Sequence, residues 1–123
     1  MRYFDHETLD VYKRAMEFLA AADDALGPLK KRAYLKNQVQ RAALSIVLNI
    51  AEGSGEVMGE GKARFFRMAR RSATECAAAL DAAAKLSGLQ EGDHMKMREG
   101  LLSVAAMLFS MERISLERGR RRQ

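Results

Sequence analysis

The chain has 123 residues, of which 48% are hydrophobic and 30% are charged, and its formal net charge is +5. This length fits a single domain, residues 1–123, that buries enough apolar surface to form one core without crosslinks. A single cysteine, Cys76, excludes an internal disulfide, and no apolar run is long enough to span a bilayer, so we expect a cytoplasmic protein with no membrane partner.

Helix-favouring residues dominate the composition, and three clusters of helix breakers divide the chain. The breakers are Gly27-Pro28, the glycine-rich stretch 53–61, and Ser87-Gly88 with Gly92. The four segments between them are predicted to be helices over residues 7–26, 31–52, 62–86 and 93–118. Residues 119–123 are predicted to form a disordered basic tail. Four similar helices with short connections favour an all-α fold, an antiparallel up-down-up-down four-helix bundle.

Each predicted helix has apolar residues spaced three and four positions apart, the pattern of one buried face. We predict that these faces form the core. Their members are Leu9, Tyr12, Met16 and Leu19 in the first helix; Leu35, Val39, Ala42, Ile46 and Ile50 in the second; Phe65, Ala69, Ser72, Cys76, Leu80 and Ala83 in the third; and Met97, Leu101, Val104, Leu108 and Met111 in the fourth.

Further apolar residues lie outside these faces. In the second helix they are Leu44, Val47, Leu48 and Ala51. The first helix adds Val11, Ala15, Phe18 and Ala22, and the fourth adds Leu102, Ala106 and Phe109. Leaving large apolar side chains in water forgoes about 1.5–3 kcal/mol each, so we predict a homo-oligomer whose interface includes the extra face of the second helix. The alternative, deep packing within one bundle, competes most strongly for the first and fourth helices.

Cations gather in windows that contain no acid. Lys36 and Arg41 lie in one such window, between Ala25 and Ala51. The third helix opens with a second window, which contains Lys62, Arg64, Arg67, Arg70 and Arg71. Its four arginines fall on one broad face opposite the core. Guanidiniums on such a ridge bind phosphates with little sequence selection, so we predict that the cations of both windows contact RNA or DNA. The alternative is that they keep the helix soluble or pair locally, as Arg71 would with Glu75.

A strip of polar residues borders the core face of the second helix. It comprises Ser45, Asn49 and Glu52, and the third helix contributes Ser72 and Glu75. Polar residues between helices set their register and choice of partner, which is the role we favour. Paired carboxylates also perform acid–base chemistry, but no nucleophile arrangement is evident, and His6 and His94 lack a second ligand at metal spacing. We therefore predict no catalytic residue, no metal and no cofactor.

The segment 40–53 reads QRAALSIVLNIAEG, the opening helix contains LDVYKRAME at 9–17, and RFF at 64–66 is followed by SATE at 72–75. Together these runs resemble the family of 23S rRNA-intervening sequence proteins over nearly the whole chain. In place of the proline that usually follows Ser-Ile in the family, this chain has Val47, which puts a helix bend there in doubt.

The resemblance implies an antiparallel four-helix bundle that assembles as a ring, a pentamer, and it implies no reaction. Family members are encoded within inserts in large-subunit ribosomal RNA genes. A distant relative, the accessory variability protein of diversity-generating retroelements, binds nucleic acid and a reverse transcriptase. The resemblance assigns Arg41 and the polar strip to signature positions without giving them a catalytic role.

Two classes of function remain open. In the first, a non-enzymatic basic oligomer acts as an adaptor that binds RNA or DNA. In the second, the oligomer is a protein-interaction scaffold whose charge recognises an acidic protein partner. Binding of nucleic acid that weakens steeply as salt rises would distinguish the first from the second.

Overall fold

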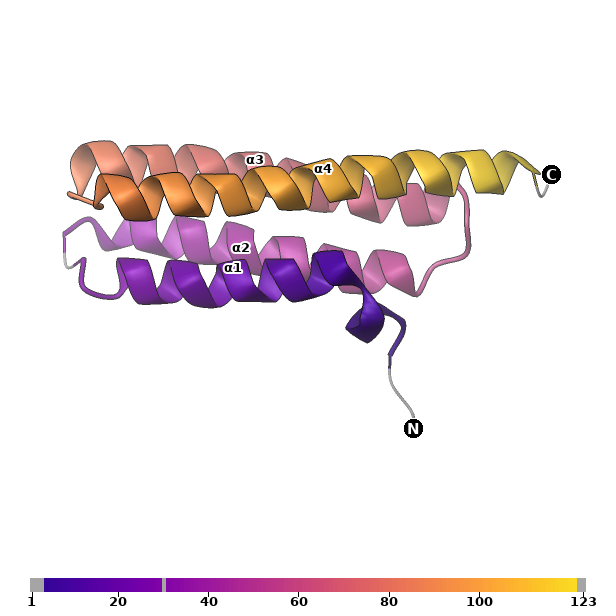
Figure 1. Cartoon of the computed structure of the whole chain (residues 1–123), viewed down its shortest axis with the longest axis horizontal. Coiled ribbons are helices and arrows are strands. Elements are labelled where there is room, and N and C mark those ends of the chain that lie inside the picture. The colour runs from indigo at the N-terminus through magenta and orange to yellow at the C-terminus, as the bar shows by residue number, and fades with distance from the viewer. Residues whose placement is uncertain (1–3, 30, 122–123) are drawn as a thin grey trace.

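The computed structural model describes residues 4–29 and 31–121, which form four α-helices and one short 3₁₀ helix. The elements are η1 (Asp5–Thr8), α1 (Asp10–Leu26), α2 (Ala33–Ser54), α3 (Glu60–Leu86) and α4 (Glu91–Arg121). Figure 1 shows that each long helix runs back along the one before it, so the bundle is antiparallel with up-down-up-down topology. The predicted all-α fold is confirmed, and the described residues include no strand.

The four helices surround one core in the cyclic order α1, α2, α3, α4. Helix α1 packs against α2 and α4, and α3 packs against the same two neighbours. Each helix therefore has one face toward the core, two flanks toward neighbours and one outer face. Within the described ranges, none of the helices is long and apolar enough to cross a membrane.

The core confirms the predicted buried faces of α2, α3 and α4 with small changes. Every predicted core residue of α2 is buried. In α3 the fully buried phenylalanine is Phe66, whereas the predicted Phe65 is half-buried. In α4 the last predicted residue, Met111, is half-buried because it lies at the edge of the core.

The predicted core face of α1 is wrong. The helix buries its other apolar face, which consists of Val11, Ala15, Phe18, Ala22 and Leu26. Leu9, Tyr12 and Leu19 are only partly buried against the core, and Met16 is 40% exposed. Both faces have helical spacing, so the packing of α1 against α2 and α4 determined which of them turned inward.

The apolar residues outside the predicted core faces are buried in some helices and exposed in others. Deep packing within one bundle accounts for the extra face of α1 and for Val47, which is 6% exposed. Ala51 is half-buried, while Leu44 and Leu48 are 45% and 53% exposed. The outer face of α4 is also open to solvent, because Leu102 and Phe109 are 58% and 51% exposed.

The glycine-rich stretch 53–61 was predicted to separate two helices, but its first residue lies inside α2. Gly53 is buried against α3, and a Cβ there would lie 2.9 Å from Phe65 Cβ and from Phe66 Cε1. Gly59 precedes α3 with a φ of +122°, a left-handed conformation that favours glycine.

Helix α4 extends beyond its predicted end and projects past the neighbouring helices (Figure 1). Gly119 lies directly against Gly59, and the contact leaves no room for a side chain on Gly119. The predicted disordered tail, 119–123, is therefore helical as far as Arg121, and residues 122–123 lie outside the described residues.

Candidate nucleic-acid interface

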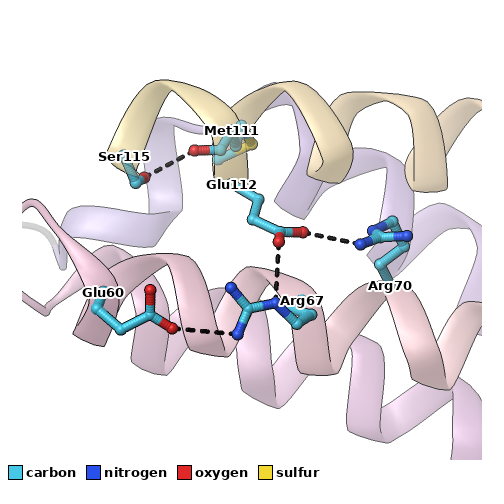
Figure 2. Close-up of polar contacts among 6 residues, drawn as sticks. All are labelled: Glu60, Arg67, Arg70, Met111, Glu112 and Ser115. Carbon is cyan, nitrogen blue, oxygen red and sulfur yellow. Dashed lines mark hydrogen bonds and ion pairs between the residues drawn. The ribbon is translucent and has the colours of Figure 1, made fainter. Parts of the chain in front are cut away.

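Two of the arginines at the start of α3 bind an acid of α4 (Figure 2). Arg67 Nε donates to Glu112 Oε2 at 2.9 Å, and Arg70 Nη2 donates to Glu112 Oε1 at 2.9 Å. Arg67 Nη1 also donates to Glu60 Oε1 at 3.2 Å. The Glu112 side chain is only 13% exposed, so these ion pairs lie in the seam between α3 and α4. We call this arrangement the Glu112 clamp.

The charges of the clamp stabilise one another. Burial alone would raise the pKa of Glu112, but hydrogen bonds from Arg70 and Arg67 outweigh it and hold that pKa below its ordinary value. Hydrogen bonds to Glu112 and Glu60 raise the pKa of Arg67. Arg70 also stacks over the Phe109 ring at 5.3 Å. These guanidiniums are therefore committed to holding α3 and α4 together.

Lys62, the first cation of the same acid-free window, caps the end of α2. Its Nζ donates to the backbone carbonyls of Gly53 at 3.1 Å, Ser54 at 2.9 Å and Glu56 at 3.1 Å. An ammonium has three protons, so all of them are used within the chain. Burial lowers the pKa of Lys62, while Asp5 and Glu56 act in the opposite direction. This position matches the preference for cations near the last carbonyls of a helix.

The remaining arginines of the α3 ridge point into solvent. Arg64 is exposed and lies over the Phe65 ring at 5.3 Å. Arg71 is exposed, and across residues 4–29 and 31–121 no ion pair joins it to Glu75 or to another acid. The single ridge predicted from spacing is thus divided: Arg67 and Arg70 turn toward α4, whereas neither Arg64 nor Arg71 forms an ion pair with an acid among the described residues. On α2, Arg41 is exposed and Lys36 is half-buried.

The structure adds cations at the end of α4, where Arg120 and Arg121 had been predicted to lie in a disordered tail. Arg118, Arg120 and Arg121 are exposed on the last turns of α4. The contact between Gly119 and Gly59 brings these turns to the end of the bundle where α3 begins, which is also the end that carries Arg64. We call Arg64, Arg71, Arg118, Arg120 and Arg121 the exposed arginine set. The sequence signal for these cations was the high density of arginines near the C-terminus. They were not predicted as binding residues, because the tail was predicted to be disordered.

The predicted polar strip does meet between α2 and α3. Ser45 Oγ and Ser72 Oγ share a hydrogen bond of 2.8 Å, and Asn49 Nδ2 donates to the Ser45 carbonyl at 2.9 Å and to its Oγ at 3.2 Å. Ser72 is buried and Ser45 is half-buried, so this hydroxyl pair lies between the two helices at the edge of the core. Such a pair disfavours sliding of α2 along α3, because sliding would leave a buried hydroxyl unpaired.

The two carboxylates of the strip do not share a site. Ser45 lies opposite Ser72, and from this point the antiparallel helices carry Glu52 and Glu75 in opposite directions, about 15 Å apart along the bundle axis. Each carboxylate lines its own open depression of about 340 Å³. Across the described part of the chain, no group of three His, Cys, Asp or Glu side chains is placed to hold a metal ion.

Comparisons with known proteins agree with this architecture. The family model of 23S rRNA-intervening sequence proteins matches residues 7–110. The fold also resembles a crystal structure from Bacteroides thetaiotaomicron, described as a protein with unknown function from the S23 ribosomal protein family. The two chains are 17% identical, with a TM-score of 0.76 over 83% of this chain and 97% of that one, which shows a shared fold. None of the curated proteins matches the chain.

Proposed function

We propose that this chain, which belongs to the family of 23S rRNA-intervening sequence proteins, is a non-enzymatic adaptor that binds RNA or DNA as a cytoplasmic homo-oligomer. Membership confirms the resemblance predicted from the segment 40–53. The observation that carries the proposal is the exposed arginine set. Arg64, Arg118, Arg120 and Arg121 lie at the end of the bundle where α3 begins, and Arg71 lies about 10 Å further along α3. Arginine binds phosphate oxygens through two parallel hydrogen bonds, and such contacts supply affinity without sequence selection.

The structure narrows the cations that we propose for phosphate contacts. Lys62 donates all its protons to carbonyls of the chain, and Arg67 and Arg70 already bind Glu112. Recruiting these three cations to a phosphate would break contacts that hold the bundle. Lys36 and Arg41 lie along α2, so they would contact only a ligand that also extends over that helix.

Assembly would strengthen this binding. The exposed leucines Leu44 and Leu48 support a homo-oligomer, and the pentameric ring implied by the family resemblance would repeat the exposed arginine set on every protomer. Several weak contacts on one ligand raise its apparent affinity through effective concentration. Each additional neutralised phosphate also steepens the salt dependence of binding.

The test is a fluorescence-anisotropy titration of nuclease-treated protein with labelled duplex DNA and structured RNA, at low and near-physiological salt. For the wild type we expect binding that weakens steeply with salt. Arg71→Ala and Arg120→Ala should each reduce the slope of log K against log salt by about 1 for every phosphate that the variant no longer neutralises in the binding site. Arg98→Ala is the matched control, because Arg98 is an exposed arginine near the start of α4, at the other end of the bundle.

Absence of binding to both probes at low salt would rule out the adaptor, and a labelled acidic protein would then test the scaffold that the sequence left open. A loss of affinity in Arg98→Ala equal to that in Arg71→Ala would show that only net charge matters, not the exposed arginine set.

A further inference from the structure

One cavity of the bundle lies between α1 and α4. It is an open groove of about 510 Å³ whose floor contains the buried side chains of Phe18 and Met97. Two small residues, Ala21 and Gly100, keep the groove hollow. A hollow lined by apolar and small residues between two helices is the shape that receives the side chains of a third helix.

Charge is distributed unevenly along this groove. Arg14 lies at one end, where its Nη1 donates to Ser103 Oγ at 2.8 Å. Asp24 and Asp93 lie at the other end, about 15 Å from Arg14 along α1. Glu17 lies one helical turn from Arg14 on α1, and Lys96 lies one turn from Asp93 on α4. Arg14 and Glu17 offset each other at one end, whereas Asp24 and Asp93 outweigh Lys96 at the other, so the Asp24 end of the groove is the negative one.

The outer face of α2 carries the complementary pattern. Arg41, Leu44, Leu48 and Glu52 line one side of the helix and share one shallow depression. The two leucines are the exposed part of the face that was predicted to join protomers. Arg41 and Glu52 flank them about 16 Å apart, close to the length of the groove.

We propose that α2 of one protomer docks into the α1–α4 groove of a second copy of this chain. Leu44 and Leu48 enter the hollow beside Gly100, Arg41 meets Asp24 and Asp93, and Glu52 meets Arg14. This match aligns α2 antiparallel to the neighbour's α1, which is also its direction relative to α1 in its own bundle (Figure 1). Neighbouring protomers therefore point the same way, and Arg64, Arg118, Arg120 and Arg121 of each protomer lie on the same rim of the assembly.

Other surfaces fit less well. Two copies of α2 packed face to face would also pair Arg41 with Glu52, but they would place one convex face on another and leave the groove empty. The outer face of α4 exposes Leu102 and Phe109, yet Arg70 and Arg113 already stack over the Phe109 ring at 5.3 and 5.9 Å.

The proposal rests on the homo-oligomer of the proposed function and is tested by mixing two variants. Leu44→Asp/Leu48→Asp removes the α2 knobs and leaves the groove intact. Gly100→Met fills the groove and leaves α2 intact. A Cβ on Gly100 meets only Phe18 Cδ2, at an ordinary 3.7 Å, and replacing a helical glycine favours the helix, so the bundle keeps its fold.

Light scattering after size exclusion, at one protomer concentration, gives the readout, and circular dichroism checks the fold. We expect an oligomeric wild type, two monomeric variants, and a 1:1 heterodimer when the variants are mixed, because each retains one intact surface. Each variant alone should weaken assembly by at least about tenfold. Leu102→Asp, on the outer face of α4, is the control and should leave the oligomer unchanged.

Three results would overturn the proposal. They are a Gly100→Met protein that still assembles, folded variants that stay monomeric on mixing, and a Leu102→Asp protein that dissociates. Should Gly100→Met fail to fold, Arg41→Asp replaces it, and adding Asp24→Arg to the same chain should restore assembly. A monomeric wild type would contradict the homo-oligomer of the proposed function as well. The anisotropy titration measures nucleic-acid binding separately, so the two failures can be distinguished.

Discussion

Replacing Glu112 with Gln tests whether the Glu112 clamp stabilises the bundle. The substitution keeps the size of the side chain and changes an anion into a neutral amide. Its oxygen still accepts from one arginine, but its NH2 group faces the other donor, so one of the two 2.9 Å bonds is broken and the other is weakened. Hydrogen bonds to charged groups contribute about 1.5–3 kcal/mol each, so we expect the free energy of unfolding to fall by about 2–3 kcal/mol. For a domain of this size, that lowers Tm by about 6–12 °C.

Thermal melts at fixed protomer concentration measure this effect, because assembly also raises Tm. Glu99→Gln is the matched control, since Glu99 is an exposed carboxylate on the same helix with no ion pair among the described residues. A surface change of this kind is expected to alter stability by less than about 0.5 kcal/mol. The clamp is refuted as a stabilising feature if both variants melt within a degree or two of the wild type.

Acid should remove the difference between wild type and Glu112→Gln. The folded-state pKa of Glu112 lies below its ordinary value, so its carboxylate contributes stability that is fully present above the unfolded pKa. That contribution is lost as pH falls from the unfolded pKa, near 4.3, through the lower folded value. Melts of the two proteins should therefore differ at pH 7 and converge in strong acid, and a difference that grows in acid would contradict the assigned cause.

Three further predictions concern Gly53, Lys62 and Cys76. Gly53→Ala places a methyl group 2.9 Å from the Phe66 ring, so urea unfolding should show a loss of about 1–3 kcal/mol, whereas Gly92→Ala, with no atom within 4 Å, should cost nothing. Lys62→Met removes the three carbonyl contacts that cap α2, and amide hydrogen exchange should accelerate in its last turn while the middle of the helix stays protected. Burial raises the pKa of Cys76 to about 12, so iodoacetamide at pH 8 should label the urea-unfolded chain and spare the native one.

Helix α1 shows where sequence periodicity stops being informative. Two of its faces have apolar residues at helical spacing, and the sequence offers no local reason to bury Phe18 and leave Met16 40% exposed. The choice depends on the rotation of the helix against α2 and α4, which is a property of the assembled bundle. In α2 the predicted face, which contains both isoleucines and Val39, is the buried one, although Leu44 and Leu48 gave that helix a second apolar face as well.

The arginines show the same limit for the candidate site. The ion pair of Arg67 with Glu112 joins residues 45 positions apart, and nothing in the local sequence indicates that the two meet. Spacing along one helix identifies only nearby acids, such as Glu75, as possible ion-pair partners. By that criterion Arg67 and Arg71 are equally exposed to solvent and equally able to bind phosphate. By contrast, the contact of Ser45 with Ser72 was predictable, because both flank core residues and the flanks of adjacent helices face each other.

This division of the arginines decides how binding defects must be interpreted. Arg67→Ala removes a partner of a Glu112 carboxylate that is only 13% exposed, so it should lower Tm as well as any affinity for nucleic acid. Arg71→Ala removes an exposed side chain, so its affinity should fall while Tm stays the same. If both variants bound more weakly at unchanged Tm, the undivided ridge predicted from spacing would describe the protein better than the Glu112 clamp. A loss of affinity therefore identifies a phosphate contact only in a variant whose melting curve matches that of the wild type.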